Sequence, residues 1–154
     1  MTDQSSGWQA HDPEPGPAPG MEFAGPGARL VGYIVDTFIV GAVVVVLFII
    51  AGLFVVTLPI LSIVPFLAIP VITLAYFPYF WSHSGQTPGQ KMMGIKVVRD
   101  LDGGPVTVGS AILRLIGYWV SGFVFYLGYI WIFIDKRKRG WFDLIAGTVV
   151  VKAK

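Results

Sequence analysis

The residues of this sequence that could do chemistry are charged residues set within or beside long apolar stretches. Arg29 and Asp36 lie near the start of the first stretch. Seven residues are close to two helical turns, so in a helix both side chains project from nearly the same face, about 10 Å apart along the axis. An ionised carboxylate two turns into an apolar helix is costly unless it is paired or hydrated. Asp36 is therefore a candidate proton or cation site, and a structural ion pair that orients helices is the alternative.

Possible partners for these two side chains lie later in the chain. Arg114 stands at the start of another apolar stretch and could pair with Asp36, whereas Asp143 could pair with Arg29. Gly32, one turn before Asp36, would let another backbone approach this helix face closely. The alternative roles are structural: a topology signal at Arg29, an interfacial anchor at Arg114, and a cap or tie for the terminal strand at Asp143.

Other kinds of chemistry find no support in the sequence. It has no cysteine, which excludes disulfides, thiol catalysis and thiolate metal sites. The two histidines, His11 and His83, share no ligand spacing, and no nucleophile, phosphate-loop or zincin motif occurs. We therefore expect no enzyme activity, no cofactor, and no metal site beyond a transient cation at Asp36. The net charge of +2 bears on membrane topology and does not predict nucleic-acid binding.

The apolar stretches that position these residues are long enough to cross a bilayer. No Asp, Glu, Lys, Arg or His occurs from Thr37 to Ser82 or from Leu115 to Ile134. A hydrocarbon core of about 30 Å needs roughly 20 helical residues, so the first run has the length for two crossings. A soluble protein of 154 residues has too little interior to bury such runs, because its helices must keep a polar face. The sequence therefore predicts an all-α membrane protein in contact with the lipid bilayer.

The predicted elements are two full transmembrane helices, a third apolar segment and a small cytoplasmic β element. Residues 1–27 are acidic and rich in Pro and Gly, which predicts a disordered tail. The membrane domain covers residues 28–152. Its parts, in order, are a helix over about 28–56, a helix over about 60–82, a polar connector over 83–108, the third segment over about 109–135, and a strand over about 148–152.

The connector carries the signals for the β element. Residues 85–91 are typical of a turn rather than a helix. Residues 95–99 have strand character, and residues 106–108 could return as a second short strand. We expect the terminal strand over about 148–152 to pair with residues 95–99 at the membrane surface.

The distribution of basic residues predicts the topology. They occur in the connector and again after the third segment, but not near residues 57–59; the second group is Lys136, Arg137, Lys138 and Arg139. Because positive residues favour the cytoplasmic side, the tail and the connector belong inside. One full crossing by the third segment would place its basic group outside, so we expect a bent or re-entrant segment, broken near Gly122 or Gly128. The same basic group could bind anionic lipid or serve only as a topology signal.

Several pieces of the sequence together form a recognisable pattern. They are Gly27-Ala28-Arg29-Leu30 through Asp36, Gly85-Gln86-Thr87-Pro88-Gly89-Gln90-Lys91, Gly94-Ile95-Lys96-Val97-Val98, Arg114, and the ending Trp141-Phe142-Asp143-Leu144-Ile145-Ala146-Gly147-Thr148-Val149-Val150-Val151. In this order, and over about residues 27–152, the chain resembles the RDD family of bacterial membrane proteins. The family is named for an arginine and two aspartates, which fall here on Arg29, Asp36 and Asp143. Where the family often has a histidine before the last aspartate, this chain has Phe142, so a proton relay through that neighbour is not available.

The resemblance implies a multi-pass protein of the bacterial inner (cytoplasmic) membrane. The molecular function of the family is mostly unassigned; transport of unknown ligands has been proposed, and some members have been linked to sodium/proton exchange. The leading hypothesis is therefore a transporter or transport-associated protein, with sodium/proton antiport at Asp36 as one form. Because two or three helices rarely enclose a pathway, this hypothesis predicts a homo-oligomer or a larger complex. The alternative is a non-transporting scaffold that assembles or regulates another membrane complex.

Overall fold

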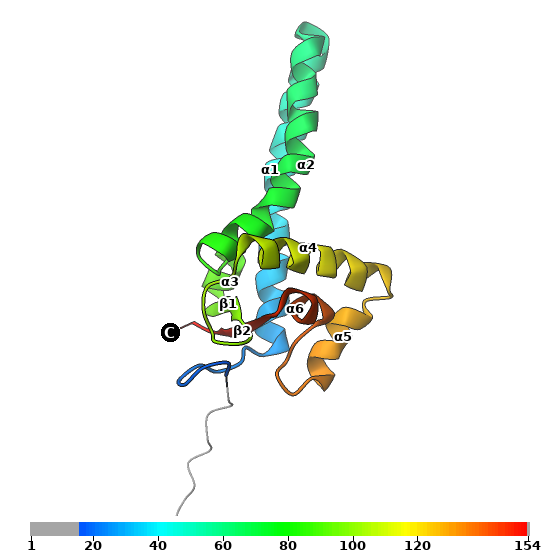
Figure 1. Ribbon diagram of the computed structural model, residues 1–154. Helices are drawn as coiled ribbons and strands as arrows, with labels where there is room; N and C mark the ends of the chain where they lie inside the picture. Colours follow the sequence, from blue (N-terminus) through cyan, green and yellow to red (C-terminus); the bar gives the residue numbers. More distant parts are fainter. Residues whose placement is uncertain (1–15, 154) are drawn as a thin grey trace, which may run out of the picture.

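The molecule consists of a long helical hairpin and a smaller body gathered around one end of it (Figure 1). The structure is a computed structural model that describes residues 16–153. Its elements, in order, are α1 (Pro26–Thr57), α2 (Pro59–His83), α3 (Pro88–Met92), β1 (Ile95–Arg99), α4 (Val108–Phe123), α5 (Leu127–Ile134), α6 (Trp141–Ala146) and β2 (Thr148–Lys152). We call residues 84–153 the basal body. The predicted fold class is confirmed: two long apolar helices, a bent third segment and a small sheet.

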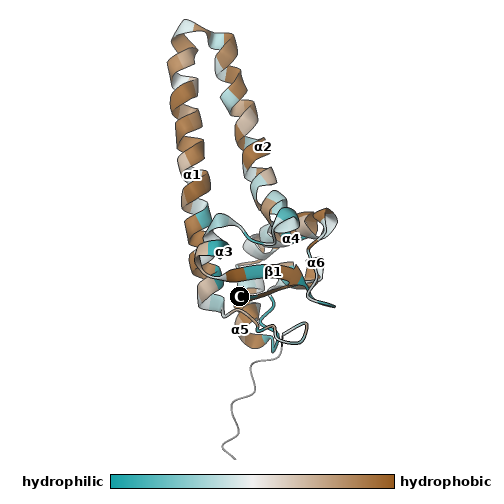
Figure 2. Ribbon diagram, turned by 90° about the vertical axis from the view of Figure 1, so that its left-hand side faces the viewer, coloured by the Kyte–Doolittle hydropathy of each residue, from teal (hydrophilic) through white to brown (hydrophobic). Residues whose placement is uncertain are grey.

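The hairpin is formed by α1 and α2, which are joined at Leu58. Each helix begins with a proline, whose missing N–H costs nothing in the first turn. Both are long and apolar enough to cross a membrane, and only 6% and 11% of their most apolar stretches is buried. Figure 2 shows apolar ribbon along most of α1, while α2 mixes apolar turns with paler ones. The side chains of the hairpin must therefore contact lipid or other helices.

The third apolar segment is bent, as predicted, but it consists of two helices. α4 and α5 meet at an angle of 103° across residues 124–126. Phe125 and Tyr126 have positive φ angles of 50° and 59°, a conformation that bulky residues rarely adopt. The break lies between Gly122 and Gly128, the two positions that the sequence indicated.

α4 runs crosswise at the base of the hairpin (Figure 1). Its buried residues are Ala111, Arg114, Gly117 and Ser121, which recur every three or four positions and define one face of the helix. The opposite face exposes large apolar side chains such as Trp119 and Phe123. Thr107 caps the helix by accepting a hydrogen bond from the Ser110 amide at 3.2 Å. The predicted strand over residues 106–108 is therefore wrong, because Thr107 begins a helix instead.

The small sheet pairs the two strands that the sequence predicted. β1 and β2 are antiparallel, with Val97 opposite Val150. The last residues of the predicted disordered tail pair with β2 of this sheet. Residues 1–15 lie outside the described residues, but Phe23 bridges to Val151, and the Ala24 amide donates to the Val150 carbonyl at 2.8 Å. Because Phe23 and Ala24 are buried, the folded domain begins before residue 28.

The predicted turn over residues 85–91 contains a helix that the sequence did not indicate. α3 begins in the second half of this segment, and a complete capping box stabilises its start. The Thr87 hydroxyl accepts a hydrogen bond from the backbone N–H of Gln90, and the Gln90 side chain accepts one from the backbone N–H of Thr87. Two turn-forming glycines and a proline obscured this helix, which has only five residues. It lies against α1 (Figure 2).

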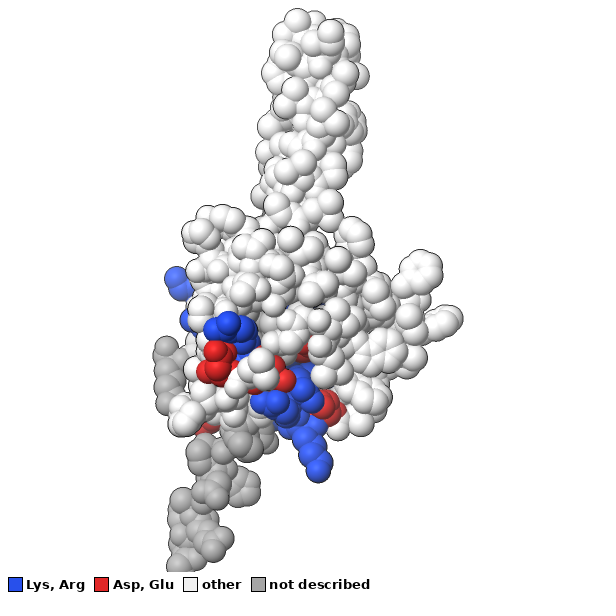
Figure 3. Space-filling view, in the orientation of Figure 1, with Lys and Arg blue, Asp and Glu red and all other residues white. Residues whose placement is uncertain are grey.

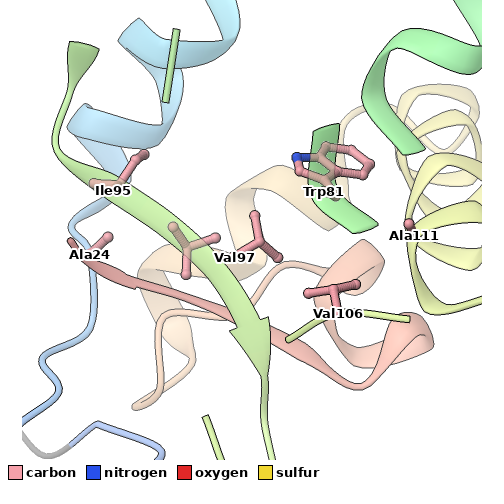
Figure 4. Close-up of a cluster of buried hydrophobic side chains, with 7 residues drawn as sticks. Ala24, Trp81, Ile95, Val97, Val106 and Ala111 are labelled. Atoms are coloured by element: carbon pink, nitrogen blue, oxygen red, sulfur yellow. The ribbon is translucent and has the colours of Figure 1, made fainter. Parts of the chain in front are cut away.

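One buried apolar cluster joins the base of the hairpin to the sheet (Figure 4). Trp81, at the end of α2, packs with side chains from α4, the sheet and the segment before α1; the cluster is Ala24, Trp81, Ile95, Val97, Val106, Ala111 and Val150. The core of the molecule therefore lies in the basal body and holds the lower end of α2 in place.

Candidate functional site

Asp36 lies where α3 packs against α1. Its side chain is almost fully buried, with 1% of the residue exposed. A Cβ added to Gly89 would collide with the Gly32 carbonyl oxygen and stand 2.9 Å from the Asp36 carboxyl carbon. The missing side chain of Gly89 therefore allows the backbone of α3 to approach the face of α1 that carries Asp36, whereas a Cβ on Gly32 would make ordinary contacts of 3.4 Å with α3.

The Asp36 carboxylate is held by three neutral donors. The Tyr76 hydroxyl donates to Oδ1 at 3.0 Å, and the Gly89 amide donates to the same oxygen at 2.8 Å. The Thr87 hydroxyl donates to Oδ2. Within the described residues, none of the partners of Asp36 is a cation. The predicted Asp36–Arg114 pair is wrong, because α4 turns Arg114 toward a different carboxylate.

That carboxylate belongs to Asp143, which binds both arginines. Arg29 Nη1 donates to Asp143 Oδ2 at 2.8 Å, and Arg114 Nη1 pairs with Oδ1. The Gly140 amide adds a hydrogen bond of 3.0 Å to Oδ2, so Asp143 also caps α6. The predicted proximity of Arg29 and Asp143 is seen. Asp143 joins α1, α4 and α6 through one buried group.

Arg114 is surrounded by aromatic rings as well as by polar partners. Its guanidinium carbon lies 4.9 Å from the centre of the Trp81 ring and 5.3 Å from that of Phe142. These distances are typical of cation–π contacts. Nη1 also donates to the Thr148 hydroxyl at 2.7 Å. Phe142 thus provides an aromatic face for Arg114 at the position where the family often has a histidine.

A cavity of about 350 Å³ lies beside these charges. Arg29 and Arg114 line it, as does Asp36. The rest of its lining is mostly apolar and comes largely from α1 and α5, including Leu30 and Phe133. Charged groups at the edge of an otherwise apolar cavity are the usual arrangement of a ligand site.

The predicted basic group after the third segment forms a surface network of ion pairs. Arg137 and Arg139 pair with Asp100 at 2.9 and 3.0 Å, and Arg139 also pairs with Asp135 at 3.0 Å. Hydrogen bonds from Arg139 lower the pKa of Asp135, and the bond to Asp135 raises the pKa of Arg139. Because Asp100 follows β1, this basic group lies on the same side of the molecule as the connector. Figure 3 shows charged side chains gathered over the basal body, while the hairpin shows none on this face.

Sequence reasoning missed several residues of these sites. Tyr76, Thr87 and Thr148 contribute hydroxyl groups, which no charge pattern indicates. The signal for Thr87 was present, because a threonine three residues before Gln90 is a capping-box pattern. Among residues 16–153, no three side chains from His, Asp and Glu gather as a metal site would require. Sodium at Asp36 stays a prediction.

Comparisons with known proteins agree with the sequence pattern. The model of the RDD family matches residues 23–147, a range that includes all four charged residues of the two sites. The chain is 39% identical to uncharacterized protein YxaI of Bacillus subtilis (strain 168) over 82 residues, which are 53% of each chain. It is 29% identical to uncharacterized protein RP437 of Rickettsia prowazekii (strain Madrid E) over 83 residues, which are 54% of this chain and 46% of that one. The chain thus spans about half the length of the curated relatives it matches, and no solved structure matches it.

Proposed function

The chain belongs to the RDD family, and on that premise we propose that this membrane protein takes part in ion transport, with Asp36 as the carboxylate that exchanges a proton for a cation. Sodium/proton exchange is the form of transport that we propose. The observation that carries the proposal is the neutral surrounding of Asp36: a buried carboxylate whose three partners are two hydroxyl groups and an amide. A buried negative charge without a cationic partner favours binding a proton or a cation.

The chemistry of the partners fits this role. The hydroxyl groups of Tyr76 and Thr87 donate to the carboxylate here, but a hydroxyl oxygen also accepts hydrogen bonds and binds hard cations. Rotation of these two groups would turn donors to the carboxylate into ligands for sodium beside it. The site could therefore hold either ion without a change of fold.

The position of Asp36 along α1 also fits. Twenty-one residues separate it from Thr57 at the far end of the helix, a length of about 30 Å. This equals the thickness of a bilayer core, so Asp36 would lie at the boundary with the basal body. We place that body, with the connector and the N-terminal tail, on the cytoplasmic side of a bacterial inner membrane, because its basic residues favour that side.

Transport requires more helices than one chain supplies. The hairpin leaves most of its apolar surface exposed, with 6% and 11% of its most apolar stretches buried. We therefore propose that the working form is a homo-oligomer or a larger membrane complex, and that it has no enzyme activity. A protein that stays monomeric in a native-like bilayer would count against transport.

The test is sodium-dependent proton flux in proteoliposomes that contain the wild type or Asp36→Asn at equal amounts. Asn has nearly the same shape, and its carbonyl oxygen can keep the bonds from Tyr76 and Gly89, but its NH2 group cannot accept from Thr87 and it cannot exchange a proton. We expect the variant to lose the flux while it keeps its helicity and its oligomeric size. Asp102→Asn, which removes a carboxylate that is 55% exposed in the basal body, is the matched control and should keep full flux. Equal flux from the wild type and from empty liposomes, over several cations and pH values, would reject exchange.

A scaffold that assembles or regulates another membrane complex is the second candidate. The observation that favours it is the same exposed hairpin, whose two apolar helices are free to pack against helices of another protein. This candidate predicts that Asp36→Asn lowers the amount of folded protein as much as any activity. Normal accumulation of Asp36→Asn together with loss of flux separates the two proposals.

A further inference from the structure

The buried charges around Asp143 do not balance by direct pairing, although the Asp36 carboxylate lines the same cavity. Two guanidinium groups, those of Arg29 and Arg114, share one carboxylate. The side chains of Arg29, Arg114 and Asp143 are 9%, 1% and 0% exposed, so water compensates little of the excess positive charge. In addition, Nε of Arg29 and Nε of Arg114 are buried without a hydrogen-bond partner. Both the spare charge and the spare donors call for an anion.

The cavity beside these arginines offers a place for that anion and for an apolar group attached to it. Arg29 and Arg114 line the cavity of about 350 Å³, which is within the usual size of a ligand site. Away from the arginines its lining includes Leu30 of α1 and Ile130 and Phe133 of α5. These three side chains are 60%, 51% and 75% exposed, so the apolar side of the cavity opens to the surface of the molecule.

We propose that this cavity binds an anionic lipid, whose phosphate oxygens accept hydrogen bonds from Arg29 and Arg114 and whose acyl chain lies along Leu30, Ile130 and Phe133. A phosphate oxygen is a strong acceptor for guanidinium groups. The site is separate from the basic surface group at residues 136–139, where Arg137 and Arg139 are paired with Asp100 and Asp135. Asp36 lines the same cavity, but its carboxylate is bound by Tyr76, Thr87 and Gly89 and, among the described residues, makes no ion pair with either arginine.

The depth of the arginines favours a lipid over a free anion. Arg29 precedes Asp36 by seven residues, which places it about 10 Å further from the joined end of the hairpin. If the hydrocarbon core ends near Asp36, Arg29 lies at the level of the lipid headgroups. Leu30, the next residue, lies at the same level and begins the apolar lining of the cavity. A free phosphate ion offers the same oxygens but leaves this apolar lining exposed to water.

The experiment is native mass spectrometry of the full chain in detergent, titrated with phosphatidylglycerol and, separately, with phosphatidylcholine. We expect one phosphatidylglycerol molecule to be retained about tenfold more tightly than phosphatidylcholine, the difference that one charged hydrogen bond makes. Arg29→Gln leaves Asp143 paired with Arg114 and should weaken phosphatidylglycerol binding about tenfold. Lys136→Gln removes the same charge from an exposed position and should leave the affinity unchanged.

A second variant keeps the test decisive if Arg29→Gln does not fold. Ile130→Trp narrows the apolar part of the cavity without changing any charge, and it should also weaken lipid retention. Equal losses from Arg29→Gln and Lys136→Gln would overturn the proposal, because they would show general attraction of basic residues for anionic lipid. Displacement of the lipid by millimolar inorganic phosphate would overturn it too, because the site would then be one for free phosphate.

Discussion

The hairpin and the basal body of this protein are stabilised by different kinds of contact. In the hairpin, α1 and α2 bury few of their apolar side chains, and the lipid or partner helices must cover the rest. In the basal body, short helices and two strands are joined through buried polar groups, above all the Asp143 carboxylate and its two arginines. We therefore expect the hairpin to tolerate exchange of one apolar residue for another, and the basal body to be sensitive to the loss of a single polar contact.

The two regions meet at the lower half of α1, where both sites lie. Asp36 joins α1 to α3, and Arg29 joins α1 to α6 through Asp143. The hairpin therefore depends on the basal body for its orientation, although it depends on the bilayer for its environment. The contrast predicts that damage to the polar contacts of the basal body exceeds damage to comparable contacts of the hairpin.

The largest effect is expected from Asp143→Asn. This substitution leaves two buried guanidinium groups without a carboxylate, a loss that typically costs about 3–5 kcal/mol. We expect little folded protein and a much lower melting temperature in detergent. Asp102→Asn, which breaks an exposed ion pair with Arg99 at 3.0 Å, should change stability by less than about 1 kcal/mol. Similar losses from both substitutions would remove the distinction between buried and surface charges.

A smaller effect is expected from Gly117→Ala in α4. The added Cβ would stand 2.6 Å from Cα of Phe142, and this backbone atom can move only if α6 shifts. Such overpacking costs about 1–3 kcal/mol. Gly122→Ala in the same helix has nothing within 4 Å of the added Cβ and should be neutral or slightly stabilising. The melting temperatures of the two variants test this difference. An unchanged melting temperature for Gly117→Ala would contradict the close packing of α4 on α6.

Thr87→Val tests the junction between α3 and α1. It removes a donor to Asp36 and the cap of α3, which together cost about 1–2 kcal/mol. Thr37→Val is the matched control in the hairpin, because the Thr37 hydroxyl bonds only to the Tyr33 carbonyl of its own helix, and its effect should stay within about 0.5 kcal/mol. Hydrogen exchange of α3 amides should rise in Thr87→Val alone. Unchanged exchange there would show that Asp36 does not hold α3.

The smallest effect concerns the surface network at Asp135. Hydrogen bonds from Arg139 lower the pKa of Asp135 below its ordinary value of 3.8. The ionised group therefore stabilises the folded state above that value, and the stabilisation is lost as the pH falls through the lowered pKa. Unfolding of the wild type and of Asp135→Asn should differ by a constant amount from about pH 5 to 7, and the difference should shrink as the pH falls below 3.8. A difference that stays constant well below pH 3.8 would exclude the Asp135–Arg139 contribution.

Composition predicted the hairpin, because the absence of charge over residues 37–82 leaves few alternatives to two crossings. The pairing of β1 with β2 also followed from the sequence, since both segments have strand character and one partner each. The sequence did not predict the partner of Arg114. From the sequence alone, Arg114 could pair with either Asp36 or Asp143. The packing of α4 against α6 determines that it pairs with Asp143.

The Asp36 site was predicted only in part for a similar reason. Helical spacing placed Gly32 and Asp36 on one face of α1, and this edge does receive another backbone. The element that approaches it is α3, a helix of five residues held by the Thr87 cap and by Asp36 itself. A helix so short has no periodic pattern of its own. Its existence depends on tertiary contacts that a sequence does not display.

We propose that only the hairpin crosses the membrane, while α4, α5 and the rest of the basal body stay on one side. Because the sequence has no cysteine, single cysteines at Leu58, Asp102 and Lys136 can be labelled one at a time with a membrane-impermeant maleimide in sealed vesicles of known orientation. We predict that Asp102→Cys and Lys136→Cys react from the same side and Leu58→Cys from the opposite side. Labelling of Lys136→Cys from the side of Leu58→Cys would mean that the bent pair crosses the bilayer, and would contradict the account.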